Sequence, residues 1–275
     1  MLANSGADAT EAFEEFHFRS TKAHKVLASL PSRKAPPLPE SGLYAGSKSD
    51  AKVLANFAAF RADLVREGFF ERSLLHLAYR LAELAAIFVL GLYLFSLGTP
   101  LALGLAVLTH GLFGARCGWL QHEGGHTSLT GNLWLDKRLQ AVTIGFGLGA
   151  CANMWNSMHF KHHATPQKVG HDMDLDTTPL AAFFPTAVEA NRARGFSRLW
   201  ARFQAWTFLP VTSGVFVMGF WLLYLHPREV LRKRLWEQGA WMASSHLVRA
   251  ALIQQLVGCS ALTAYGLFAA CMWGV

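Results

Sequence analysis

The sequence predicts an all-α, multi-pass helical membrane protein with a cytosolic, histidine-rich metal-binding region. Three observations lead to this fold class. Hydrophobic residues make up 52% of the 275 residues and charged residues only 16%, whereas about one quarter of a soluble protein is charged. Apolar segments of helix length lie on both sides of residues 119–176. Within that stretch fall six of the 12 histidines, five of them in two dense clusters and the sixth at His171.

The charge and cysteine content exclude two classes of protein. The formal net charge is +7, but the basic residues lie in the N-terminal arm and in the loops between apolar segments. This distribution favours contact with anionic lipid headgroups and predicts no nucleic-acid partner. The four cysteines are far apart and form no CxxC pair, so we expect small buried side chains rather than disulfides. No signal peptide is visible at the acidic, polar start.

The first expected element is a short helix over residues 8–17. Asp8 or Thr10 can cap it, acidic residues follow in its first turn, and Phe13 and Phe16 fall on one face. A linker over residues 31–48 follows, because four prolines lie close together in its first part (Pro31, Pro36, Pro37, Pro39).

Residues 49–72 then predict a polar amphipathic helix along the membrane interface. Two spans are expected next, over residues 74–97 and 101–114, and the short turn between them makes a hairpin. Both outer ends of this hairpin are basic, so the positive-inside rule places them in the cytosol. The long loop over residues 117–204, with both histidine clusters, is then cytosolic as well.

The remaining apolar segments predict less about topology. Residues 139–154 are apolar but short and rich in glycine, which favours an interfacial segment or one buried against protein. Residues 205–225 and 250–275 are each long enough to span. The loop of residues 226–234 between them is basic, although a single crossing from the cytosol would place it in the lumen. Residues 205–225 therefore either cross the membrane or only dip into it.

Each histidine cluster has a spacing that places its imidazoles on one face of a helix. The first spells Gln121-His122-Glu123-Gly124-Gly125-His126, and the second spells His159-Phe160-Lys161-His162-His163. Imidazole suits iron, zinc, copper and nickel alike. Five histidines exceed the three or four of one zinc site, so the clusters predict two metals, or one metal with further histidines around it. We expect lone histidines elsewhere to be packed or interfacial (His76, His110, His226, His246) or at the surface (His24).

The two clusters with their flanks carry a resemblance. Residues 119–126 resemble the first histidine box (HxxxH) of membrane fatty acid desaturases, and residues 155–167 resemble the second (HxxHH). Residues 168–176 and 224–228 are similar to the front-end subgroup, which carries a fused cytochrome b5 domain. That subgroup inserts a double bond between an existing one and the carboxyl end of a polyunsaturated acyl chain.

The resemblance implies an oxygen-dependent desaturase with a non-haem di-iron centre, embedded in the endoplasmic reticulum membrane. Electrons would come from NADH or NADPH through a reductase and cytochrome b5, and the acyl chain would be carried by coenzyme A or a phospholipid. Glu123 stands where the family has Asp and would orient a ligand imidazole. The implied iron ligands are five (His122, His126, His159, His162, His163). His171 is a further candidate ligand, and the weaker candidates for a place beside the metal are Asn156, Asp172, Asp136 and Asp174.

Both ends of the sequence depart from the family pattern. Residues 1–30 resemble the end of a cytochrome b5 domain, in which His17 would be a haem ligand, but the His-Pro-Gly-Gly loop that precedes it in such domains is absent. We expect haem b only if that missing part is supplied. Residues 49–275 form the expected desaturase domain, without the third box (QxxHH): Gln254 and Gln255 are followed by Leu256 and Val257. We therefore expect a partial front-end desaturase that binds iron incompletely and is inactive.

Two other readings stay open. Residues 122–126 also spell HExxH, the pattern of a zinc metalloprotease with two zinc ligands and a glutamate base. Two adjacent glycines weaken the helix this pattern needs by roughly 1 kcal/mol each, and the second cluster would have no role. The desaturase scaffold could also serve a hydroxylase or a non-catalytic protein that only binds partners.

Overall fold

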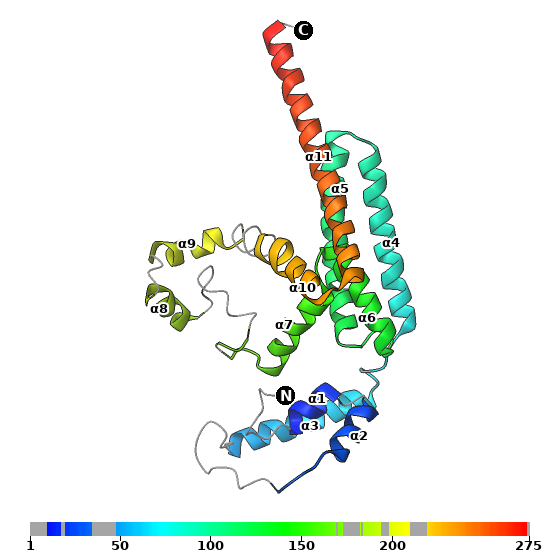
Figure 1. The fold of residues 1–275 in the computed structure, drawn as a ribbon, viewed down its shortest axis with the longest axis vertical. Coiled ribbons are helices and arrows are strands. Elements are labelled where there is room, and N and C mark those ends of the chain that lie inside the picture. Colours follow the sequence, from blue (N-terminus) through cyan, green and yellow to red (C-terminus); the bar gives the residue numbers. More distant parts are fainter. Residues whose placement is uncertain are drawn as a thin grey trace. The chain divides into compact units, whose positions relative to one another are not determined.

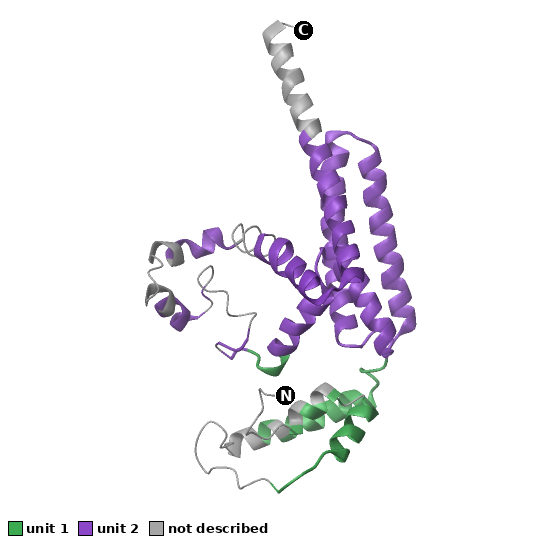
Figure 2. Ribbon diagram, in the orientation of Figure 1, with its two compact units in different colours: residues 1–71, 163–166 green, residues 72–162, 167–275 purple. Residues whose placement is uncertain are grey.

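The computed structural model describes residues 10–17, 20–34, 48–168, 170–172, 182, 184–193, 198–209 and 219–273. Within these ranges the secondary structure is helical and includes no β-strand (Figure 1), which confirms the predicted all-α class. The chain divides into two compact units (Figure 2). Unit 1 holds residues 1–71 and 163–166, and unit 2 holds residues 72–162 and 167–275.

Unit 1 contains three helices, α1 (Thr10–His17), α2 (Thr21–Ser29) and α3 (Lys48–Arg66). Ser20 caps α2 by accepting a hydrogen bond from the amide of Ala23. The helix expected over 49–72 was predicted too long. It ends at Arg66 because Gly68 adopts a left-handed conformation with φ of 78°, which terminates a helix at little cost. Most of the linker, residues 35–47, lies outside the described residues.

Unit 2 is built on a helical hairpin of α4 (Leu74–Ser96) and α5 (Pro100–Gly125). Ser73 caps α4, and Thr99 with Pro100 starts α5. Among the described helices these two are long and apolar enough to cross a membrane, as predicted. The second helix is longer than the span of residues 101–114 that was expected. The helix continues to Gly125 because no breaker interrupts it, and so the first histidine box lies on the last turn of a membrane helix.

The glycine-rich segment after the first box is buried against this hairpin. It comprises α6 (Leu133–Val142), a π-helical stretch, η2 (Thr143–Leu148), and the start of α7 (Ala152–Ala164). Ile144 and Cys151 are almost completely buried. A Cβ on Gly147 would overlap the Cys117 side chain of α5. Of the two alternatives given for residues 139–154, the segment buried against protein is the one observed.

The C-terminal half contains α8 (Pro185–Ala193), α9 (Arg198–Leu209), α10 (His226–Lys233) and α11 (Trp236–Trp273). The basic segment expected as a loop over 226–234 is mostly helical, because Glu229 accepts ion pairs from Arg232 and Lys233 on the same face. The apolar segment expected from residue 250 is part of a helix that begins at Trp236. Residues 210–218 lie outside the described residues, so a crossing by 205–225 stays a prediction.

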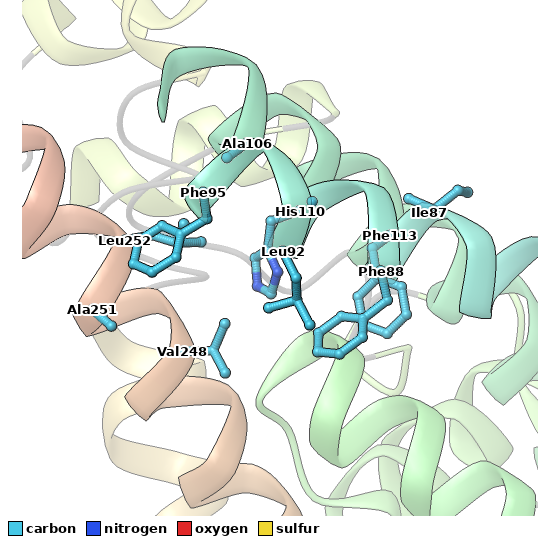
Figure 3. A pocket seen from close by; sticks show the side chains of 11 residues that line it. Ile87, Phe88, Leu92, Phe95, Ala106, His110, Phe113, Val248, Ala251 and Leu252 are labelled. Carbon is cyan, nitrogen blue, oxygen red and sulfur yellow. The ribbon is translucent and has the colours of Figure 1, made fainter. Parts of the chain in front are cut away.

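An apolar pocket of about 140 Å³ lies where α11 approaches the α4–α5 hairpin. Figure 3 shows aromatic and aliphatic side chains around it, with His110 directed into it. The Nε2 atom of His110 is buried and has no hydrogen-bond partner among the described residues. The residues that line the pocket come from all three helices (Ile87, Phe88, Leu92, Phe95, Ala106, His110, Phe113, Val248, Leu252).

We expect Gly147→Ala to destabilise the protein by about 1–3 kcal/mol, because the added methyl group must displace the Cys117 side chain in a packed region. The matched control is Gly104→Ala, since a Cβ at Gly104 meets nothing within 4 Å. Thermal unfolding in detergent measures both variants. Equal melting temperatures for the two variants would contradict the close packing of η2 on α5.

Candidate metal centre

Two helices bring the histidine clusters together. His122 lies on the last turn of α5 and His126 is the residue that ends it, while His159 and His163 lie one turn apart on α7. The Nε2 atoms of His126 and His159 are 3.0 Å apart. One ring nitrogen from each of these four histidines lies within 4.8 Å of the other three. Residues 33 positions apart in the sequence therefore meet at one point.

Trp155 supports the imidazoles from α7. Its ring stacks on that of His159 at a centroid distance of 4.1 Å and meets the His122 ring edge-on at 5.6 Å. His122, Trp155 and His159 line a cavity of about 400 Å³ together with Trp119. The cavity gives a small molecule access to the imidazole nitrogens, and the stacked indole restricts the orientation of the His159 ring.

The two glycines between the histidines of the first box permit this approach. A Cβ on Gly125 would lie 2.6 Å from Trp155 and 2.8 Å from the Gln140 amide nitrogen. A Cβ on Gly124 would lie 3.0 Å from the carbonyl oxygen of Asp136 in α6. Any side chain at either position would push α6 or α7 away from α5.

A buried amide network connects the three helices beneath the histidines. Gln140 of α6 and Asn156 of α7 exchange two amide hydrogen bonds of 2.9 and 3.0 Å, and Gln140 also donates to Gln121 of α5 at 3.4 Å. Lys137 donates to the carbonyl of Gly125 at 2.7 Å, an acceptor that the end of α5 leaves without a helical partner. Burial lowers the pKa of Lys137.

Sequence reasoning named Asn156 as a residue near the metal and missed Gln140, Gln121 and Lys137. A glutamine within an amphipathic helix gives no signal that it will be completely buried, as Gln140 is. Asn156 contacts Gln140 rather than an imidazole. A place for Asn156 beside the metal stays a prediction, and what the structure shows is its contact with the network that holds the helices.

His162 lies on α7 between the two clustered histidines and contacts Asp172. Both carboxylate oxygens of Asp172 are 3.0 Å from Nδ1 of His162, and the backbone amide of Gln167 donates to the same carboxylate at 2.8 Å. Asp172 is 1% exposed. An ionised carboxylate can only accept hydrogen bonds, so it holds the proton on Nδ1 and leaves Nε2 of His162 as the atom able to bind a metal.

Side chains from α10 and α11 fix the start of α7. The backbone amide of Cys151 donates to Nδ1 of His226 at 2.8 Å, and the amide of Asn153 donates to the Gln238 side-chain oxygen at 3.1 Å. These amides belong to the first turn, where a helix cannot satisfy its own donors. His226 is 3% exposed, as expected for a packed histidine, and burial lowers its pKa to about 4. It is therefore a neutral acceptor at pH 7.

Two of the other predicted residues, Glu123 and Asp136, lie at the end of α5 or hold the loop after it. Glu123 lines a second, polar cavity between α4 and α5. The carboxylate of Asp136 accepts the amides of Thr130 and Gly131 and so holds the loop after α5. His171 is exposed and belongs to no metal-binding group among the described residues. Asp174 lies outside the described residues.

His17 ends α1 in unit 1. Its ring lies 4.9 Å from that of Phe13, which also contacts the His24 ring at 5.2 Å. A role for His17 as a haem ligand stays a prediction.

The donor set fits a transition metal. Four imidazoles with nitrogens this close repel one another when they are protonated. When they are neutral, all four can bind the same metal ion. Three of them are half-buried and the fourth, His163, is exposed. His162 can add a further ligand, because Asp172 holds its Nδ1 and leaves its Nε2 available. The arrangement therefore has the donors and supporting hydrogen bonds that a histidine-rich metal site needs.

Comparison with known proteins gives the context for this site. The sequence model of the family described as fatty acid desaturase matches residues 97–275. An acyl-lipid (8-3)-desaturase of Rebecca salina is 45% identical over 237 residues, covering 86% of this chain and 53% of the relative. One of Thraustochytrium sp is 41% identical over 244 residues, covering 88% and 55%. The chain thus spans about half the length of these relatives. No solved structure matches.

We expect His226→Leu to loosen α7, because the Cys151 amide then loses its buried acceptor at a cost of about 1–3 kcal/mol. His226→Asn keeps an acceptor atom near the Nδ1 position and should retain most of the stability. The wild-type histidine is neutral when folded and binds a proton more readily when unfolded. The free energy of unfolding should therefore fall by up to about 3 kcal/mol as the pH decreases from about 6.5, the pKa of an unfolded histidine, towards about 4, the pKa of folded His226.

Chemical unfolding of the wild-type protein and both variants at pH 7 and pH 5 measures these effects. His226→Asn should lose much of the pH dependence in this range, because asparagine does not titrate. An unchanged pH dependence in His226→Asn would show that other groups cause the loss of stability in acid.

Proposed function

The chain belongs to the fatty acid desaturase family, as the resemblance of its histidine boxes predicted, and on this premise we propose that it takes part in the oxygen-dependent desaturation of a fatty acyl chain. The observation that carries the proposal is the meeting of both histidine boxes at one point, with the Nε2 atoms of His126 and His159 3.0 Å apart. Packing alone seldom gathers four imidazoles.

We propose a non-haem di-iron centre as the cofactor, with His122, His126, His159, His162 and His163 as ligands. When bound, iron supplies the oxygen chemistry that removes hydrogen from an unactivated methylene group. The residues of this chain would hold and shield it. Trp155 orients the His159 ring, Asp172 keeps the proton of His162 on Nδ1, and the Gln140–Asn156 pair fixes the separation of α6 and α7.

An acyl lipid is the proposed substrate, and three observations support it. The relatives are named acyl-lipid desaturases. The described chain has two helices that can cross a membrane, and an apolar pocket lies between them and α11. His110 in that pocket precedes His122 by 12 residues on α5, a separation of about 18 Å along the helix. An extended acyl chain can cover such a distance.

Further expectations from the resemblance are part of the proposal. Electrons would come from an NAD(P)H reductase through cytochrome b5, and residues 1–30 would be the end of a cytochrome b5-like domain, with His17 as a haem ligand. The endoplasmic reticulum membrane would carry the protein with both histidine boxes facing the cytosol. Residues 49–275 would form the part of the desaturase domain that precedes the third histidine box.

We expect the purified chain to contain iron, although less than a full di-iron centre. His126→Ala or His159→Ala should reduce this iron content at least about tenfold, because each removes an imidazole from the centre of the group. Elemental analysis by mass spectrometry measures iron and zinc per chain, and gas chromatography of lipids from the expressing cells measures desaturation. His24→Ala in unit 1 is the control. One zinc per chain with no iron would instead favour the HExxH metalloprotease.

We expect Asp172→Asn to lower iron affinity about 10–100-fold with little loss of folding, because asparagine keeps the shape but not the charge that holds the His162 proton. Competition with a chelator measures the affinity. Asp63→Asn, at an exposed ion pair of α3, serves as the matched control. If Asp172→Asn retained iron as well as the control, His162 would not need Asp172 in order to bind.

A further inference from the structure

A second cavity lies beside the histidine-lined one and contains charges of both signs. It has a volume of about 230 Å³ and lies between the first turns of α4 and the last turns of α5. From α4 it receives Arg80 and Glu83, and from α5 it receives Arg116, Trp119 and Glu123. The residues of each helix are three, four or seven apart, so each set lies on one face.

One end of this cavity is positively charged. Glu83 bridges the two arginines, at 2.8 Å from Arg80 and 3.3 Å from Arg116. The triad therefore has a net charge of +1, and a guanidinium can still donate hydrogen bonds to a further anion because each presents five donors. Arginines held in this way are suited to a phosphate group.

The other end is negative and aromatic. The carboxylate of Glu123 forms no hydrogen bond or ion pair with any residue that the structure describes, while attraction to Arg80 acts on it at longer range. Trp119 lies one helical turn before it and is 71% exposed. A carboxylate beside an exposed indole is a favourable site for a quaternary ammonium group, through charge attraction and cation–π contact.

Trp119 also lines the cavity that contains His122, Trp155 and His159. The two cavities are therefore neighbours that share the Trp119 indole. A molecule with its polar group beside Glu123 can extend an attached chain past Trp119 to the histidines. The position at the end of two membrane-spanning helices is where tryptophan and arginine face lipid headgroups.

The geometry points to a binding site for a zwitterionic phospholipid headgroup, with the phosphate at Arg80 and Arg116 and the ammonium at Glu123 and Trp119. This inference rests on the proposed function and deepens it, because it makes a phospholipid the acyl carrier. Coenzyme A is disfavoured, since its several phosphates would bring further negative charge against Glu123 in a cavity that offers a net charge of zero.

Lipid retention by the full purified chain tests the site. The protein in detergent is equilibrated with equimolar phosphatidylcholine and phosphatidylglycerol, and phosphorus NMR measures each lipid retained per chain. Wild type should retain an excess of phosphatidylcholine. Glu123→Gln should lower that excess at least about threefold and raise phosphatidylglycerol retention, because the ammonium partner is lost and the repulsion of anions with it.

Arg116→Gln should reduce retention of both lipids about tenfold, and Arg138→Gln, at an exposed arginine of α6, should change neither. Equal retention of both lipids by wild type, an unchanged ratio in Glu123→Gln, or displacement by coenzyme A would each overturn the inference. The ratio is independent of how much protein folds. Iron is measured on the same samples, so a chain with iron but no lipid preference refutes this site alone, whereas one with lipid preference but no metal refutes the proposed function.

Discussion

The metal region depends on the close contact of three helices at the Gly124-Gly125 pair. Without a Cβ at these positions, α6 and α7 reach the backbone of α5, and the Gln140 side chain can bond to both neighbours. A helix loses about 1 kcal/mol for each interior glycine, but here the glycines lie in its last turn, where few helical hydrogen bonds remain to be weakened. The same two glycines that would weaken the helix of a zinc protease allow the second histidine box to approach the first.

This contact connects the membrane hairpin to the metal centre. Because α5 continues past the expected end of its span, His122 is carried on a helix anchored in the bilayer rather than on a free loop. The start of α7 is held separately, by His226 and Gln238 from the C-terminal part of the chain. The imidazoles of α5 are thus positioned by the membrane hairpin and those of α7 by the C-terminal part of the chain. The distance between the two sets depends on both of these contacts.

Much of the arrangement could be predicted from local sequence. The spacing of the histidines and the apolar spans are short-range signals, and the four grouped histidines are among the five expected. The rest depends on contacts between distant residues. Nothing near Gln140 in the sequence signals that it will contact Asn156. The basic residues of 226–234 likewise do not reveal that His226 accepts a hydrogen bond from the Cys151 amide. The apolar character of residues 101–114 marks only part of α5, because the helix continues through the more polar residues of the first box to Gly125.

The central claim is that imidazoles from α5 and α7 share one metal centre. Iron K-edge X-ray absorption of the purified chain tests it most directly, because imidazole rings scatter in a way that separates them from carboxylate or water ligands. The account predicts a nitrogen-rich shell with imidazole scattering that weakens when either His122 of α5 or His159 of α7 is replaced by alanine. A shell without imidazole scattering would contradict the account, and so would one that changes in only one of the two alanine variants.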